Sequence, residues 1–171
     1  MRPEARRRCG SWLLACLTLG AALLLSGCQQ DPFWKIGASA PEISLFNLKD
    51  ETVKLSAYRG KVVVLRFWAS GCKECVAGMP AMDRYSQKYR ERGLTILAVN
   101  MGNSQEYVAG FVKNMQLGYP VLRDPELIAA KKYHVSALPT TFFIDRKGIA
   151  KLVVQGEVNQ RLFDKEVAAL L

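Results

Sequence analysis

The sequence predicts one α/β domain with a central mixed β-sheet flanked by helices and a β-hairpin at its N-terminal end. Apolar runs rich in β-branched residues alternate with segments of helical periodicity, in the order hairpin, then strand–helix–strand–helix. This order is typical of parallel strands joined by crossover helices. The last two strand-like runs flank a turn at residues 145–148 and should be antiparallel. A chain of 171 residues, half of them apolar, can bury one core of this kind.

Each expected element has a local signal. The run at 61–68 combines valines with aromatic residues and indicates a buried strand. Gly93 ends the long helix that follows. Ser104, Asp124 and Asn159 are expected to open the three later helices. In chain order we expect strands at 43–46, 52–55, 61–68, 94–99, 120–122, 140–144 and 149–154, and helices at 72–92, 104–115, 125–132 and 160–171.

The N-terminal segment has the composition of an export signal. Three arginines at 6–8 precede an apolar stretch, 12–25, that is shorter than the roughly 20 residues needed to span a bilayer. Residues 25–28 (Leu-Ser-Gly-Cys) resemble a bacterial lipobox, which implies cleavage before Cys28 and acylation of that cysteine. Gln29 resembles the sorting pattern for the outer membrane. We therefore expect a lipoprotein signal peptide at 1–27, a lipidated tether at 28–40, and a folded domain at 41–171, held on the periplasmic side of a bacterial membrane.

The formal net charge is +9. A basic chain often binds nucleic acid, but export argues against that partner and favours anionic lipid or an acidic protein surface. The basic run at 131–134 is interpreted as a solvated helix end, and His134 as a surface or core residue rather than a catalytic base. Nothing in the sequence requires a dimer, so we expect a monomer.

The cysteines carry the strongest functional signal. If the signal peptide is removed and Cys28 takes lipid, the mature chain keeps two free thiols, Cys72 and Cys75. A disulfide across so short a loop constrains the unfolded chain little, which argues against a purely structural bond. Zinc needs about four ligands, and the one histidine lies far along the chain, so we expect no metal and no other cofactor. Linear Cu(I) binding by the pair is an alternative. A redox couple is favoured if the pair lies where a strand meets a helix.

The expected position of Cys72 suits thiol chemistry. Free N–H groups and the helix dipole stabilise a thiolate at a helix N-terminus. Cys75 follows one turn later and is expected to point inward. We therefore expect Cys72 to be the nucleophile and Cys75 the residue that resolves the mixed disulfide.

Further motifs accompany the cysteine pair. They are Ala-Pro-Glu at 40–42, Tyr-Arg-Gly-Lys at 58–61, Phe-Trp-Ala at 67–69, Met-Pro at 79–80, Tyr-His-Val at 133–135 and Leu-Pro-Thr-Thr-Phe-Phe-Ile-Asp at 138–145. From about residue 38 onward the chain resembles the thioredoxin superfamily, and within it the TlpA/ResA-like thiol-disulfide oxidoreductases with an AhpC/TSA–redoxin-type domain. The resemblance implies a thioredoxin fold, a cis bond before Pro139 that faces the cysteines, and a Leu138 backbone free to pair with an extended substrate segment.

The resemblance also implies a function. These relatives are tethered outside the bacterial membrane and reduce protein disulfides, such as those of apocytochrome c or of copper-site proteins, with electrons from a membrane thiol carrier. Copper delivery by the same cysteines is the main alternative. A peroxiredoxin-like peroxidase is a weaker one, because that chemistry needs Pro and Thr shortly before the cysteine and residues 67–71 lack both.

Several positions depart from the family pattern. Arg66 replaces a buried Asp or Asn, Gly78 replaces a Glu near the active site, and Gly71 replaces a Trp. In relatives the carboxylates help to deprotonate the buried thiol, and Glu74, between the cysteines, is a candidate to substitute for them. Arg66 would make the couple more oxidising if it pointed toward the cysteines. Alternatively, it lies on the other face of its strand with an acidic partner.

Overall fold

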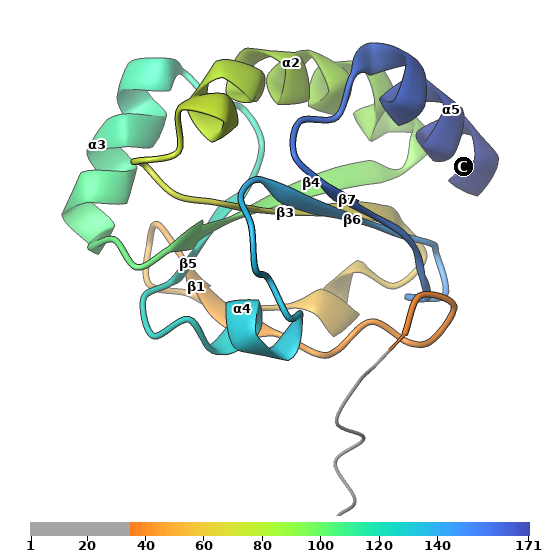
Figure 1. Ribbon diagram of the computed structural model, residues 1–171, viewed down its shortest axis with the longest axis horizontal. Helices are drawn as coiled ribbons and strands as arrows, with labels where there is room; N and C mark the ends of the chain where they lie inside the picture. The colour runs from red at the N-terminus through yellow and green to blue at the C-terminus, as the bar shows by residue number, and fades with distance from the viewer. Residues whose placement is uncertain (1–34) are drawn as a thin grey trace, which may run out of the picture. The chain divides into compact units, whose positions relative to one another are not determined.

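The computed structural model describes residues 35–171; the predicted signal peptide, lipobox and Cys28 lie outside the described residues. Within that range the predicted mixed sheet, flanking helices and N-terminal hairpin are confirmed (Figure 1). In chain order the elements are β1 (Ser44–Asn47), β2 (Thr52–Lys54), the 3₁₀ helix η1 (Leu55–Tyr58), β3 (Val62–Trp68), α2 (Lys73–Tyr89), the 3₁₀ turn η2 (Arg90–Arg92), β4 (Leu94–Met101), α3 (Gln105–Met115), β5 (Val121–Asp124), α4 (Ile128–Lys132), β6 (Thr140–Ile144), β7 (Ala150–Gln155) and α5 (Gln160–Leu170).

The sheet has seven strands in the order β2-β1-β5-β4-β3-β6-β7. The three central strands β5, β4 and β3 are parallel, and β6 and β7 add an antiparallel pair beside β3. The β1–β2 hairpin continues the sheet beyond β5. This is the arrangement that the resemblance to the thioredoxin superfamily implies, with the hairpin as an extension at one edge.

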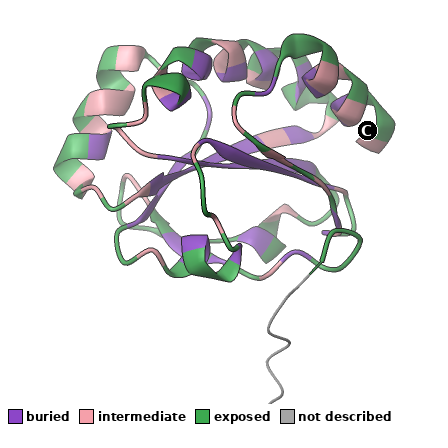
Figure 2. Cartoon of the chain, viewed as in Figure 1, coloured by how far each residue is buried: buried purple, intermediate pink, exposed green. Residues whose placement is uncertain are grey.

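Helices cover both faces of the sheet, α2, α3 and α5 on one side and α4 on the other (Figure 1). All seven residues of β3 are consequently buried, which explains its apolar run, broken only by Arg66 (Figure 2). Side chains alternate between the two faces. Val62, Val64 and Trp68 pack in the cluster that contains α2 residues, whereas Val63 and Leu65 belong to the cluster on the α4 side.

The start of α4 differs from the expected position. The helix begins at Ile128 rather than at residue 125. Asp124 still caps it, but from the last position of β5: its carboxylate accepts hydrogen bonds from the backbone N–H groups of Ala129 (3.2 Å) and Ala130 (2.8 Å). The intervening residues form a turn in which Leu127 has a φ of 58°. Leu127 rather than Asp124 therefore occupies the N-cap position, and Asp124 reaches the first turn of the helix from the end of β5.

Ordered structure begins before residue 41. Gly37 N donates to Ala150 O (2.7 Å), and Ala40 N donates to Gly148 O (2.9 Å), so this stretch pairs with the start of β7. Ala40 is buried. The last residues of the expected tether, 28–40, are thus part of the folded domain. No helix in residues 35–171 is both long enough and apolar enough to cross a membrane.

Candidate active site

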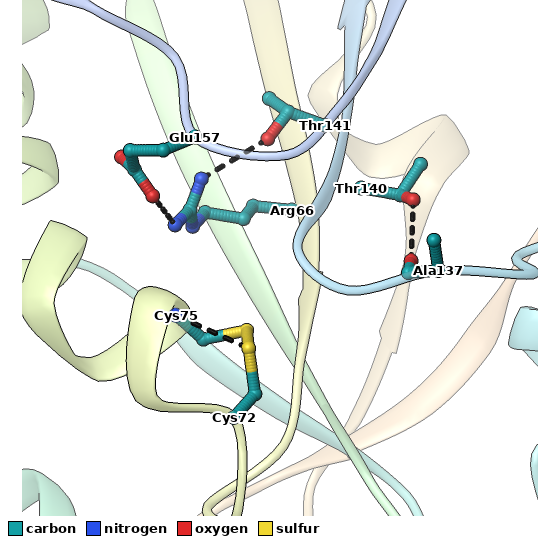
Figure 3. Close-up of a disulfide and its surroundings, with 7 residues drawn as sticks. All are labelled: Arg66, Cys72, Cys75, Ala137, Thr140, Thr141 and Glu157. Atoms are coloured by element: carbon teal, nitrogen blue, oxygen red, sulfur yellow. Dashed lines mark hydrogen bonds and ion pairs between the residues drawn. A yellow bond between two sulfur atoms is a disulfide. The ribbon is translucent and has the colours of Figure 1, made fainter.

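Cys72 and Cys75 lie at the junction of β3 and α2, where they form a disulfide with a Cα–Cα distance of 5.2 Å (Figure 3). Cys72 is the N-cap of α2 and its Sγ accepts a hydrogen bond from Cys75 N (3.1 Å). Cys72 is partly exposed, whereas Cys75 is 0% exposed. One sulfur is therefore accessible at a helix N-terminus and the other is covered by protein, an asymmetry that suits stepwise disulfide exchange.

The loop that precedes β6 lies beside this junction. The peptide bond between Leu138 and Pro139 is cis. Thr140 pairs with Phe67 across the β3–β6 ladder, which places Pro139 next to the end of β3 that leads to the cysteines. The loop is held at both sides: Thr140 Oγ1 donates to Ala137 O (2.6 Å) and Gly156 N donates to Pro139 O (2.7 Å). The chain thus fixes the proline and the cysteine pair to the same edge of the sheet.

Arg66 lies on the α2 face of its strand and has an acidic partner. It occupies an even position of β3, on the same face as Trp68 and α2, and its guanidinium points toward Glu157 (Figure 3). Arg66 Nη2 lies 2.5 Å from Glu157 Oε2, and Nη1 donates to Thr141 Oγ1 (3.3 Å). Its side chain is 2% exposed, against 36% for Glu157.

Glu157, in the loop between β7 and α5, is the site residue that sequence reasoning missed. No motif surrounds it, and it lies 91 positions from Arg66. The available signal was indirect: an arginine inside a buried strand needs an acidic partner, because an unpaired buried charge is strongly destabilising.

Gly78 makes room for Glu157. It is buried in α2, three residues after Cys75 and on the same face of the helix. A Cβ at this position would overlap the Glu157 carboxylate. The chain therefore has a carboxylate beside α2 at the position where the family pattern has a glutamate, but supplies it from a distant loop.

Three other positions singled out by the sequence contribute less to the site. Glu74 is exposed in the first turn of α2, where it interacts favourably with the helix dipole, and Glu157 rather than Glu74 pairs with Arg66. Gly71 is exposed, with open space where a Cβ would lie. His134 is exposed beyond α4, with a φ of 51°. In the described part of the chain, no three His, Cys, Asp or Glu side chains gather as a metal-binding group.

The fold and the cysteine pair together define a thioredoxin-like thiol-disulfide oxidoreductase. A family model agrees: the AhpC/TSA family model matches residues 36–153, and the chain belongs to that family. The chain is also 35% identical to the thiol-disulfide oxidoreductase ResA of Geobacillus kaustophilus over 135 residues, which cover 79% of this chain and 78% of the relative. The predicted TlpA/ResA-like resemblance and oxidoreductase activity are thereby confirmed.

Solved structures support the same class. A Chlorobium tepidum protein assigned as a thiol:disulfide interchange protein of the DsbE type superposes with a TM-score of 0.75 at 31% identity, covering 81% of this chain and 99% of that one. A Streptococcus pneumoniae protein described as an exposed lipoprotein thioredoxin gives a TM-score of 0.68 at 27% identity, covering 76% and 100%.

Proposed function

We propose that this oxidoreductase reduces disulfide bonds of exported proteins, with Cys72 as the attacking thiolate and Cys75 as the resolving thiol. The observation that carries the proposal is the unequal exposure of the two sulfurs at the start of α2. Free N–H groups and the helix dipole stabilise a thiolate at the Cys72 position. A substrate disulfide meets Cys72 first, and Cys75 can react only with a sulfur already attached there.

The exchange consists of two sulfur substitutions. The Cys72 thiolate attacks one substrate sulfur, the substrate S–S bond breaks, and the other substrate sulfur leaves as a thiolate that takes up a proton. Cys75 then loses its proton and attacks Cys72 Sγ, which releases the substrate as a dithiol and forms the Cys72–Cys75 disulfide. Two electrons pass to the substrate. A membrane dithiol carrier would return them and become a disulfide itself.

The charge balance at Arg66 supports the reducing direction. An uncompensated cation near the cysteines would stabilise the thiolate, and hence the reduced enzyme, and would make the couple oxidising. The Glu157 carboxylate offsets that charge. The substrates that fit a reductant of this class are oxidised cysteine pairs awaiting a cofactor, as in apocytochrome c or a copper-site protein.

The loop at 137–139 is the substrate surface in this proposal. Ala137 is exposed and Leu138 is partly exposed, beside the edge where the cysteines lie. An extended substrate segment would pair with the Leu138 backbone as an added strand, which orients its disulfide toward Cys72.

The proposed tether also fits the fold. Residues 37–40 pair with residues 148–150, at the end of β6 that faces Val63 rather than Phe67, and so away from the cysteines. A lipid on Cys28 would hold the domain on the periplasmic side of a bacterial membrane. The description of the pneumococcal relative as an exposed lipoprotein supports this location. The mass of the N-terminal peptide of the mature protein tests the tether, with acylated Cys28 expected as the first residue.

The direct test of function is to trap the mixed disulfide. Cys75→Ser should accumulate a covalent adduct with a disulfide-containing protein such as insulin, because Cys72 can attack but nothing releases the product. Cys72→Ser is the matched control and should form no such adduct, because its remaining thiol is buried. Adducts formed equally by both variants would contradict the assigned roles.

A further inference from the structure

Buried polar side chains lie on the face of the sheet that packs against α2. Arg66 and Trp68 lie on this face of β3, and Asn100 on the same face of β4, since Trp68 and Asn100 are register partners. Arg66 Nε and Trp68 Nε1 are buried, and within residues 35–171 neither has a hydrogen-bond acceptor. Cys75 belongs to the same packed cluster as Trp68. Donors and a guanidinium charge in a low-dielectric region favour negative charge nearby, and thus a thiolate.

The negative charge of the Glu157 carboxylate opposes this stabilisation of a thiolate, and its position is defined by two contacts. It binds Arg66 Nη2 and contacts α2 at Gly78, one helical turn beyond Cys75. Residues three apart on a helix lie roughly 5–6 Å from each other at their Cβ atoms. The carboxylate is therefore close enough to the buried sulfur for its charge to matter, and it is 36% exposed.

The phenol of Tyr119 lies near both charges. Burial raises the pKa of Tyr119; of the charges beside it, Arg66 lowers that pKa, whereas Asp83 and Glu157 raise it. Tyr119 and Cys75 belong to the same packed cluster, so the two charges lie beside the core that holds the buried sulfur.

We propose that Glu157 sets the reduction potential of the Cys72–Cys75 couple by neutralising Arg66, with Gly78 as the residue that admits the carboxylate. This inference rests on the proposed function and names the group that keeps the couple reducing. Glu157 is a positioning residue, since it acts on the sulfurs through Arg66 and through charge. Without the Glu157 charge, Arg66 would stabilise the reduced enzyme. Without Arg66, the Glu157 carboxylate would destabilise the reduced enzyme.

The test compares variants that remove one charge at a time in the full chain. We expect Glu157→Gln to make the couple more oxidising by about tenfold in its equilibrium constant with glutathione, or about 30 mV for two electrons. Arg66→Gln should shift it in the opposite direction. The double variant should have a reduction potential close to that of wild type. Arg66→Lys, which keeps the charge, should also have a potential close to that of wild type. The pH midpoint of Cys72 alkylation by iodoacetamide should fall for Glu157→Gln and rise for Arg66→Gln.

Gly78→Ala gives an independent test that leaves both charges in place. The added methyl group displaces the Glu157 carboxylate, so the shift should have the sign of Glu157→Gln and a smaller size. Alanine is favoured over glycine inside a helix, so this variant should fold even if the two charge variants do not. In that case Gly78→Ala decides alone: a shift toward oxidising supports the proposal and an unchanged potential overturns it.

The possible results separate the two proposals. Opposite shifts that cancel in the double variant support the role of Glu157, because a purely structural role would not change sign between partners. Equal potentials in folded wild type, Glu157→Gln and Arg66→Gln, or shifts of the same sign, overturn it. If wild type itself shows no reversible couple, the proposed function fails first.

Discussion

Arg66 illustrates how single residues make a buried charge tolerable. A guanidinium taken out of water is destabilising unless its N–H groups are bonded and its charge is paired. Glu157 supplies the charge and Thr141 supplies a second oxygen from the neighbouring strand β6. Thr141 is itself fully buried. Its hydroxyl is thus part of the support of the site rather than a chance polar group in a strand.

Thr141→Val should therefore destabilise the protein although it conserves shape. The variant removes an acceptor from a charged donor, and hydrogen bonds to charged groups contribute about 1.5–3 kcal/mol. The long 3.3 Å contact argues for the lower end of that range. Urea unfolding should show a lower midpoint with an unchanged slope. Thr95→Val, in β4 on the other side of β3 and partly exposed, is the matched control and should change stability by about 0.5 kcal/mol or less. Equal losses in the two variants would contradict this role for Thr141.

The element that positions Glu157 is α5. Asn159 caps it, accepting a hydrogen bond from Leu162 N (3.0 Å), only two residues after the glutamate. Phe163 stacks on Tyr85 of α2 with ring centroids 4.1 Å apart. Asp164 binds the C-terminal end of α2, where it accepts hydrogen bonds from Tyr89 Oη (2.7 Å) and from Lys88 Nζ. Because α5 packs on α2, the loop that precedes α5 keeps the Glu157 carboxylate beside α2.

The Asp164 contacts predict a pH dependence of stability. The hydrogen bond from Tyr89, followed by that from Lys88, lowers the pKa of the Asp164 carboxyl. A lowered native pKa means that this stabilisation is present above the unfolded value, about 3.9, and is lost as the pH falls through the native value. The melting temperature of Asp164→Asn should thus lie below wild type at pH 7, and the gap should narrow below about pH 4. A gap that stays constant down to pH 2.5 would contradict the assignment.

For the molecule as a whole, much of the architecture could be predicted because its signals are local. Each signal depends only on residues close to it in sequence. Examples are the apolar run of β3, the glycine after the long helix, and the caps Ser104 and Asn159. The cysteine pair at the strand–helix junction follows from the same local pattern. Disulfide chemistry then follows from two thiols placed at that junction.

What could not be predicted depends on contacts between distant segments. The position of Glu157 follows from the packing of α5 on α2, and no residue near it in sequence marks it. Asp124 was identified as a cap, but its reach across a three-residue turn depends on the tertiary path of the chain. Likewise, residues 37–40 carry no strand signal and become ordered because β7 offers free backbone groups.

The reduction potential of the Cys72–Cys75 couple tests the central claim most directly. The protein would be equilibrated with glutathione and dithiothreitol buffers and its thiols trapped by alkylation. The account predicts a reversible two-electron transition near the value of thioredoxin, about −270 mV. A transition near that of DsbA, about −120 mV, would contradict the reducing direction. The absence of any reversible transition would contradict the redox function itself and would favour Cu(I) binding by the two thiolates.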